Sequence, residues 1–327
     1  MKRRSAILLA LSGLVAPALA LPAKAQDYPD KTVRVILPFA AGGPTDVVGR
    51  VVSDRLSTVL GQRFVIENRP GGGGNIAVAA MKQAAPDGYT LMFATVSAMA
   101  VNPALQRTAP YNPVKDFEAV GQIGTTPIVL VVPPAIPATD LKSLTAYLKR
   151  PGVQASYGSA GSGSVTHLAG ELMLARLEIK DAPHVSYRGS GPMLVDLIGD
   201  RLTFAFDTLP TAIGHIKSGT LRPIGMATLA RAPGLPEVPT LDEQGLKGFD
   251  VASWYAFFAP TGTPKPIVDK LNKAINELLA EPAMVARLRE LGVDPTPGVT
   301  PAQLSNLVKQ DVAKWAEAVR ISGATIN

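Results

Sequence analysis

The sequence predicts an α/β protein of two lobes, each with a parallel-rich mixed sheet flanked by helices. Short apolar runs of strand length alternate with amphipathic runs of helical length along most of the 327 residues, which is the pattern of βαβ units. Small-residue turns join several strands to the helices that follow, so ligand crevices are expected at the carboxyl ends of the strands. The chain is also longer than a single domain usually is.

The predicted elements follow in order along the chain. Strand patterns lie at residues 33–37, 64–67, 89–94, 128–132, 154–157, 184–187, 202–207, 221–227 and 252–259. Helical patterns lie between them at 47–60, 75–85, 140–150, 165–178 and 192–199, and the last part of the chain is helical at 265–280, 283–291 and 301–319. No internal repeat or low-complexity segment interrupts this order.

Two stretches, residues 120–127 and 248–254, are predicted to be linkers between the lobes. Two crossings place both termini in one lobe, so residues 26–124 and 251–327 form lobe 1 and residues 125–250 form lobe 2. This is the arrangement of the type II periplasmic-binding-protein fold. A ligand would lie in the cleft, and the lobes would close around it by a hinge motion.

The first 25 residues have the pattern of a secretory signal peptide. A basic start at residues 2–4 precedes an apolar stretch at 6–21, and an A-x-A motif ending at Ala25 fits cleavage before Gln26. A second such motif ends at Ala20. We therefore expect a periplasmic protein whose mature chain begins near Gln26, and the sequence leaves Sec and twin-arginine export open.

Charge and cysteine content exclude several classes of function. Removal of residues 1–25 takes away four basic residues and no acidic one, so the formal net charge of +6 becomes +2. The remaining basic residues are scattered among acidic ones, whereas nucleic-acid binding needs a concentrated basic patch. The absence of Cys rules out disulfides, thiolate metal ligands and cysteine nucleophiles. We expect no nucleic-acid partner, no cofactor and no metal ion.

A small-residue turn, PFAAGGPTD at residues 38–46, joins the first predicted strand to its helix. The first N–H groups of that helix lack partners and, with the helix dipole, favour an anion. Gly42 and Gly43 would let the backbone approach the anion, and Gly43 is expected to need angles that other residues avoid. Pro44 suits the first helical position, and Asp46 could cap the first turn. A tight connection that binds nothing is the alternative.

A second strand–helix junction has the sequence SAGSGS at residues 159–164. Its hydroxyl and N–H groups, including those of Ser159, Gly161 and Ser164, can coordinate carboxylate oxygens from the side opposite the first loop. Charge-assisted hydrogen bonds of this kind contribute roughly 1.5–3 kcal/mol each. A serine-rich helix cap is the alternative.

The motifs form an ordered series that covers essentially the whole mature chain. After PFAAGGPTD come ENRPGGGGN (67–75), DGYTL (87–91), YGSAGSGS with HLA (157–164 and 167–169), YRGSGP (187–192), PTLDEQG (239–245) and WYAFFAP leading to GTP (254–260 and 262–264). This series closely resembles the extracytoplasmic solute receptors of tripartite tricarboxylate transporters, the Bug family. The resemblance implies a monomeric receptor that delivers a small carboxylate to membrane transporter subunits.

The resemblance also implies ligand-binding positions. In that family the first loop holds one carboxylate through backbone groups and bridging waters, and the matching residues are Phe39, Ala40, Ala41, Gly43 and Asp46. Thr95, Ser97 and Ala98 match a loop that lines the same lobe, and Asp207 matches a cleft position in the other lobe. A carboxylate that caps the following helix is the alternative for Asp207. The stretch from Gly71 to Gly74 with Asn75 departs slightly from the family pattern, in which Gly-Ala-Gly-Gly commonly follows Arg-Pro.

Enzyme motifs are missing, so we expect a protein that is not an enzyme. The serine-rich loop does not fit G-x-S-x-G, no P-loop follows the glycine run, and the three His residues form no H-E-x-x-H. His167 and Glu171 stand one helical turn apart, where an intrahelical hydrogen bond is favoured over a metal site. The alternatives are a secreted α/β hydrolase or transferase, and a ligand sensor for a signalling partner. The ligand would be a di- or tricarboxylate, an acidic amino acid or an aromatic carboxylate.

Overall fold

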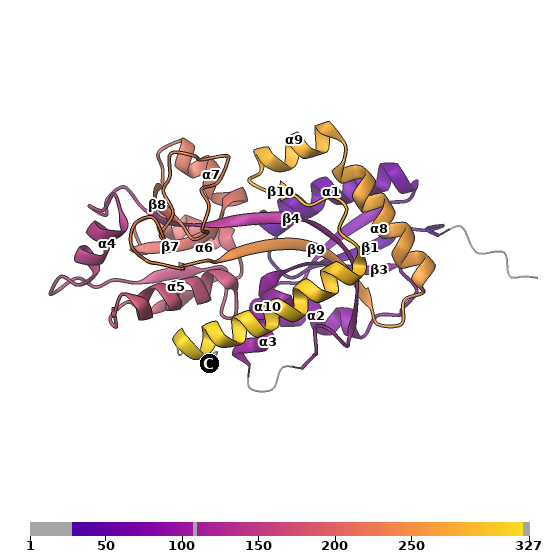
Figure 1. Ribbon diagram of the computed structural model, residues 1–327, viewed down its shortest axis with the longest axis horizontal. Coiled ribbons are helices and arrows are strands. Elements are labelled where there is room, and N and C mark those ends of the chain that lie inside the picture. Colours follow the sequence, from indigo (N-terminus) through magenta and orange to yellow (C-terminus); the bar gives the residue numbers. More distant parts are fainter. Residues whose placement is uncertain (1–27, 107–109, 323–327) are drawn as a thin grey trace, which may run out of the picture.

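The computed structural model describes residues 28–106 and 110–322. The predicted signal peptide lies outside these residues. The strands follow the spatial order β2-β1-β3-β9-β4-β7-β5-β6, with β8 and β10 added beside β4. Figure 1 shows an elongated molecule in which β4 and β9 run along the long axis and helices cover both sides. The predicted α/β class is confirmed.

One half of the molecule is built around β1, and we call its strands the β1 sheet. Its members are β1 (Val33–Leu37), β2 (Phe64–Asn68), β3 (Thr90–Thr95), β9 (Ala252–Pro260) and the first part of β4 (Phe117–Val132). β1 pairs in parallel with β2 and β3, whereas β9 is antiparallel to β3 and β4. Helices α1 (Pro44–Leu60), α2 (Asn75–Lys82), α8 (Lys265–Leu279) and α9 (Pro282–Glu290) belong to this half, with the short helices η1 (Gly72–Gly74), η2 (Ser97–Val101) and α3 (Asn102–Leu105).

The other half, which we call the β5 sheet, repeats this plan on a smaller scale. β5 (Tyr157–Ser159) pairs in parallel with β6 (His184–Ser186) and β7 (Phe204–Thr208), and β4 is antiparallel to β7 and β8 (Arg222–Met226). Its helices are α4 (Leu141–Leu148), α5 (Val165–Arg176), α6 (Ser190–Ile198) and α7 (Leu209–Lys217). The predicted strand at 154–157 begins later than expected, so Ser159 is the last residue of a buried strand rather than part of a loop.

The predicted linker at 120–127 is instead the middle of one long strand. β4 pairs with β9 from Phe117 to Pro127 and with β7 and β8 beyond that point, so it belongs to both sheets. The prediction failed because Gly121, Gly124 and Pro127 interrupt the apolar pattern. Two register shifts accommodate the first two glycines. At Gly124 a Cβ would lie 2.5 Å from the Asp294 carbonyl oxygen of β10 (Asp294–Pro295), so only glycine lets β10 approach.

The last helix, α10 (Pro301–Ser322), spans the two halves. It packs against η2 and α3 beside the β1 sheet and against α5 beside the β5 sheet, and Figure 1 shows it running alongside β9. Trp254 Nε1 donates to Asp311 Oδ2 of α10 at 2.7 Å, and Lys314 of α10 pairs with Asp250 at 3.3 Å. A helix expected to belong to lobe 1 alone therefore contacts both halves.

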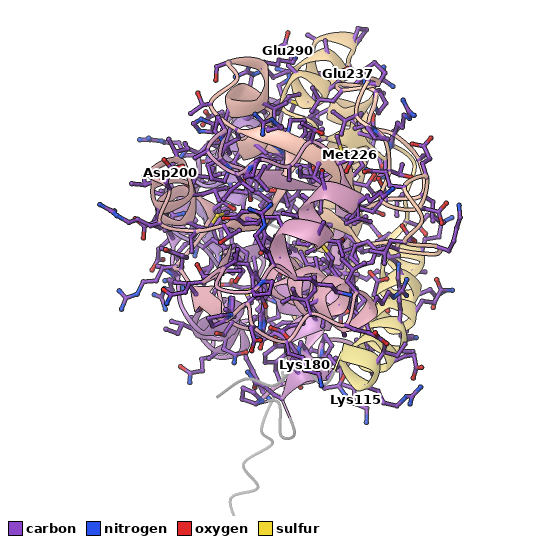
Figure 2. The ribbon with its side chains drawn as sticks, turned by 90° about the vertical axis from the view of Figure 1, so that its left-hand side faces the viewer. Lys115, Lys180, Asp200, Met226, Glu237 and Glu290 are labelled. Carbon is purple, nitrogen blue, oxygen red and sulfur yellow. The ribbon has the colours of Figure 1, made fainter. Side chains whose placement is uncertain are left out.

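Charged side chains of both signs lie on the outside of the molecule. Viewed along its long axis, it carries Glu237 and Glu290 at one rim and Lys115 and Lys180 at the other (Figure 2). Many described basic residues lie beside acids, as Arg55 does beside Glu281 at 2.6 Å. Within the described ranges, no helix combines the length and apolar character needed to cross a membrane.

Candidate functional site

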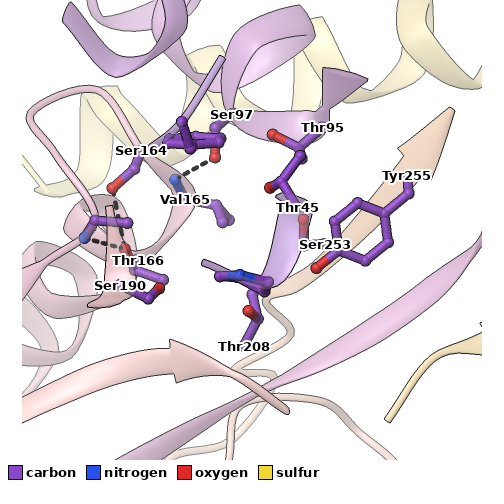
Figure 3. A pocket seen from close by; sticks show the side chains of 13 residues that line it. Thr45, Thr95, Ser97, Ser164, Val165, Thr166, Ser190, Thr208, Ser253 and Tyr255 are labelled. Carbon is purple, nitrogen blue, oxygen red and sulfur yellow. Dashed lines mark hydrogen bonds between the residues drawn. The ribbon is translucent and has the colours of Figure 1, made fainter. Parts of the chain in front are cut away.

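A small cavity lies where the carboxyl ends of the parallel strands of both sheets meet, and we call it the inner cavity. Its volume is about 30 Å³, and its lining residues are Phe39, Pro44, Thr45, Thr95, Ser97, Ala160, Ser164, Val165, Thr166, Ser190, Thr208, Ser253 and Tyr255. None of these described residues has a charged side chain. Figure 3 shows their hydroxyl groups arranged around a common space.

Four helices begin at the inner cavity. Thr45 stands in the first turn of α1, Val165 opens α5, Ser190 opens α6, and Thr208 is the N-cap of α7. The first N–H groups of a helix lack intrahelical partners, and the helix dipole adds partial positive charge there. Four such ends around a cavity lined by no charged side chain make the local electrostatic potential more favourable for an anion than for a cation.

Three hydroxyl groups at the inner cavity are buried without a hydrogen bond of standard geometry to any described residue: Thr95 Oγ1, Thr208 Oγ1 and Tyr255 OH. The side chains are 3%, 7% and 1% exposed. An unpaired buried hydroxyl costs roughly 1–3 kcal/mol. Burial raises the pKa of Tyr255 well above its ordinary value, while the nearby Thr208 hydroxyl acts in the opposite direction. Tyr255 therefore stays protonated and can donate to a bound anion.

Other hydroxyls of the cavity are held in place by the backbone. Ser164 Oγ caps α5 by accepting from His167 N at 3.2 Å, and it lies 3.0 Å from Thr166 Oγ1. Ser97 Oγ accepts from Val165 N at 3.0 Å (Figure 3). Because Ser97 follows β3 and Val165 follows β5, this last bond joins the two halves of the molecule.

Two more contacts join the halves beside the cavity. Ala40 N in the first loop donates to the Arg188 carbonyl oxygen at 3.3 Å. Gly73 of η1 lies so close to the second loop that a Cβ on it would stand 2.5 Å from the Ser162 carbonyl oxygen. The structure is therefore a closed conformation at this edge.

The predicted binding residues divide into three groups. Phe39, Thr95, Ser97 and Ser164 line the inner cavity. Gly161 lines a neighbouring cavity described below. The others do not line the inner cavity: Ala40, Ala41, Gly43, Asp46, Ala98, Ser159 and Asp207.

Asp46 fastens the first loop instead of capping α1. The N-cap is Gly43, which has no side-chain cap. The Asp46 carboxylate accepts from Gly42 N, Arg50 Nε and Asn68 Nδ2, each at 3.0 Å. Burial would raise the pKa of Asp46, but these hydrogen bonds outweigh it and hold the pKa below its ordinary value. The expected capping role of Asp46 is therefore wrong, because its carboxylate turns back toward the loop that precedes the helix.

The expectation that Gly43 needs a special conformation is also wrong. Its φ of −81° is open to any residue, and a Cβ on it would make only an ordinary contact of 3.5 Å with the Ala40 carbonyl oxygen. Gly42 has the left-handed conformation instead, with φ of +80°. The turn therefore requires a glycine at 42.

Asp207 lies behind the cavity and orients one of its hydroxyls. Its carboxylate is fully buried and accepts from Ser190 Oγ and Thr211 Oγ1, each at 2.5 Å. Burial raises the pKa of Asp207 to about 6, although the two hydroxyls and the Thr208 N–H oppose the shift. The helix-capping alternative is not supported, because the N-cap of α7 is Thr208 with no side-chain cap and the side-chain partners of Asp207 are two hydroxyl groups.

The raised pKa of Asp207 predicts that the free energy of unfolding depends on pH. Because the pKa is raised from 3.8 to about 6 on folding, the folded state holds the proton more tightly. The stabilisation is complete below about pH 4 and is lost as the pH rises through 6. Relative to wild type, Asp207→Asn should gain about 2–3 kcal/mol of unfolding free energy between pH 4 and 7. Urea unfolding at both pH values measures this change, and parallel pH profiles of the two proteins would contradict it.

A stacked histidine pair, of which His167 is buried, supports the second loop. His167 and His184 stack with ring centroids 4.1 Å apart, and His184 Nε2 lies 2.7 Å from Ser159 Oγ. Burial, with a contribution from His167, lowers the pKa of His184 to about 3. His167 Nε2 is 3.8 Å from Glu171, and Tyr157 donates to that carboxylate. The predicted His167–Glu171 hydrogen bond is therefore wrong, since 3.8 Å is too long. No cluster of metal-ligating side chains occurs among the described residues.

Sequence reasoning missed lining residues in and directly after the two predicted loops as well as others on distant elements. The residues not predicted are Pro44, Thr45, Ala160, Val165, Thr166, Ser190, Thr208, Ser253 and Tyr255. Ser190 could have been found, since it stands two residues before the predicted helix at 192–199, and Thr208 directly follows the predicted site residue Asp207. Ser253 and Tyr255 lie on one face of β9, and no turn motif marks them.

A larger cavity adjoins the first and shares Phe39 and Ala160 with it, and we call it the outer cavity. Its volume is about 600 Å³. The remaining lining residues are Pro38, Pro70, Gly71, Gly72, Gly73, Gly74, Asn75, Ile76, Gln106, Gly161, Ser162, Ser186, Tyr187 and Arg188. The glycine-rich loop of one half and the second loop of the other thus face each other across this space.

Known proteins share this sequence and fold. The sequence profile described as tripartite tricarboxylate transporter family receptor matches residues 48–323. Protein BugT of Bordetella pertussis is 36% identical over 323 residues, which cover 98% of each chain.

Two solved structures are also similar. R. palustris Rpa4515 with adipate has a TM-score of 0.88 and 35% identity, and the match covers 91% of this chain and 100% of that one. MatC from Rhodopseudomonas palustris with bound malate has a TM-score of 0.85 and 34% identity, with 89% and 100% coverage. The chain therefore belongs to the tripartite tricarboxylate transporter receptor family, which includes the Bug proteins.

Proposed function

We propose that this protein is a periplasmic receptor that captures a small carboxylate in the inner cavity and delivers it to the membrane subunits of a tripartite transporter. One observation carries the proposal: four helix N-termini and three unpaired buried hydroxyls surround a cavity with no charged lining residue. Such a cavity stabilises a bound anion through helix dipoles and hydrogen bonds.

Hydrogen bonds from these groups to a carboxylate supply enough free energy for micromolar binding. A hydrogen bond to a charged group contributes roughly 1.5–3 kcal/mol, and micromolar affinity needs about 8 kcal/mol. A few bonds from Thr95, Thr208, Tyr255 and the helix N–H groups therefore reach this value after ordering costs are subtracted. The wild-type cavity needs no arginine to hold one carboxylate head.

The solved relatives support this ligand class. Rpa4515 is described with adipate and MatC with bound malate, and both compounds carry two carboxylates. A hydrolase acting through Ser159 is disfavoured, because Ser159 is fully buried at the end of β5 and does not line either cavity. We therefore propose that the ligand leaves the protein chemically unchanged.

The lobe division belongs to the same proposal. Residues 26–124 and 251–327 would form one lobe and residues 125–250 the other, with the ligand held between them. The contacts from Ser97 to Val165 and from Ala40 to Arg188 would form on closure. Export through the N-terminal signal, a monomeric state and use in transport rather than sensing complete the proposal.

A thermal-shift and calorimetry panel tests the ligand class. Purified mature protein is titrated with di- and tricarboxylates, acidic amino acids and aromatic carboxylates, and with the amide of each acid as a matched control. An acid at a hundredfold excess over its Kd should add about 2.7 kcal/mol of stability. Its amide should bind much more weakly. Equal binding of acid and amide would refute an anion site, and chemical conversion of the ligand would favour the enzyme alternative.

A further inference from the structure

We infer that Asp207 takes up a proton when a carboxylate enters the inner cavity, and that its neutral carboxyl group turns the Ser190 hydroxyl toward the ligand. Capture of the anion would then be coupled to capture of a proton. This inference rests on the proposed function and adds to it a positioning residue behind the cavity. Asp207 would act on the ligand through Ser190 and not by direct contact.

Ser190 connects the inner cavity to Asp207. It is one of the residues that line the cavity (Figure 3), and its Oγ donates to Asp207 Oδ1 at 2.5 Å. A hydroxyl group carries a single proton. While Ser190 donates that proton to the ionised carboxylate, its oxygen has only lone pairs left for the cavity, and lone pairs do not bind a carboxylate.

Protonation of Asp207 reverses the direction of this hydrogen bond. A neutral carboxyl group contains one O–H donor, so Asp207 Oδ1 can donate to Ser190 Oγ instead of accepting from it. The Ser190 proton is then free to bond a ligand oxygen in the cavity. The step adds one proton from solvent to Asp207 and changes no other covalent bond.

The groups around Asp207 favour its neutral form once an anion is bound. Its side chain is fully buried and forms no ion pair with any described residue. The neighbours from α6 and α7 are the hydroxyls of Ser190 and Thr211, and Val129 of β4 lies opposite it in the sheet. The titratable side chain that interacts with it comes from β9 and is Tyr255, which stays protonated.

The charge of the ligand acts in the same direction as burial. Burial already raises the pKa of Asp207 to about 6. A second negative charge in the adjoining cavity raises this pKa further, because two like charges that lie close together disfavour each other's ionised form. The bound state of the protein therefore holds the proton more tightly than the free state does.

This difference sets the sign of the pH dependence. Below pH 6 the free protein already carries the proton on Asp207, so affinity for an anion changes little with pH. Above pH 6 each binding event takes up a proton. Affinity then falls by up to about tenfold per pH unit until the pH reaches the raised pKa of the complex.

Calorimetry at pH 6 and pH 8 tests the inference. Succinate, adipate and malate are titrated into wild type, Asp207→Asn, Ser190→Ala and the control Asp311→Asn. Burial also raises the pKa of Asp311, but this residue accepts from Trp254 and does not line the inner cavity. Titrations at pH 7 in buffers of different ionisation enthalpy count the protons taken up per ligand. Protonation of the ligand itself is common to all variants, and circular dichroism confirms that each is folded.

Wild type and Asp311→Asn should lose affinity about tenfold or more between pH 6 and pH 8 and take up about one proton per ligand at pH 7. Asp207→Asn should bind with nearly the same affinity at both pH values and take up no proton, because its amide N–H can donate to Ser190 at any pH. Ser190→Ala should bind about tenfold more weakly than wild type at pH 6.

A wild type that binds without proton uptake would overturn the inference, and this count decides by itself if a variant does not fold. Asp207→Asn that keeps the wild-type pH dependence would also overturn it, and Ser190→Ala with wild-type affinity at pH 6 would overturn the role of Ser190. Wild type that binds none of the acids at either pH would instead count against the proposed function.

Discussion

Gly73→Ala is expected to weaken ligand binding at least tenfold while leaving the protein folded. A Cβ at this position would lie 2.5 Å from the Ser162 carbonyl oxygen and 3.2 Å from the Gly163 carbonyl carbon. These are backbone atoms of the facing loop, so they cannot rotate away as a side chain could. The closed conformation would become less populated, and the apparent affinity falls in proportion to that population. Calorimetry with the best ligand of the panel measures the loss.

Gly219→Ala is the matched control for backbone strain, because Gly219 has a similar left-handed conformation but no close neighbour. Gly73 has φ of +62°, whereas Gly219 has φ of +73° and no described atom within 4 Å of the place that a Cβ would take. Each alanine should cost about 1–2 kcal/mol of stability through its left-handed backbone. Only Gly73→Ala should lose affinity. If both variants bind as wild type does, the contact between the two loops is not needed for binding.

Thr95→Val should stabilise the ligand-free protein and weaken ligand binding. The Thr95 hydroxyl is buried without a partner among the described residues at the inner cavity, so its removal should raise the unfolding free energy by about 1–2 kcal/mol. The same hydroxyl would bond the ligand, and its loss should reduce affinity about tenfold. Urea unfolding of the ligand-free protein and calorimetry measure the two effects.

Ser53→Ala is the control for Thr95→Val, because it removes an unpaired buried hydroxyl that has no proposed role in ligand binding. Ser53 Oγ is buried in α1 without a partner in the described part of the chain, but Ser53 does not line the inner cavity. This variant should gain stability and bind with wild-type affinity. A Thr95→Val protein that is less stable without ligand, or that binds as tightly as wild type, would show that the hydroxyl does not serve the ligand.

Local pattern was sufficient for the regular elements near the site. β1 has the predicted bounds, and α1 begins at Pro44, as its suitability for the first helical position indicated. Ser164 caps α5 and lines the inner cavity. These features depend on residues within a few positions of one another, because helix capping and strand–helix turns are local interactions.

Local pattern failed where neighbours distant in sequence decide the structure. β4 continues through Gly124 and Pro127 because β9 and β10 pair with it there. Asp46 does not cap its helix because Asn68 of β2 donates to its carboxylate from 22 positions along the chain. In each case the competing partner comes from tertiary contact, which overrides the intrinsic preference of the segment.

By itself, the sequence determined the α/β class, the first two strand–helix junctions of the proposed site, and the family. Only the tertiary structure decided which groups surround the cavity. Tyr255 and Ser253 reach it because β9 pairs antiparallel with β3, and Thr208 reaches it because β7 pairs with β4. The physical reason is that a binding cavity is a property of long-range pairing, whereas hydroxyl side chains in a sequence do not show which of them converge.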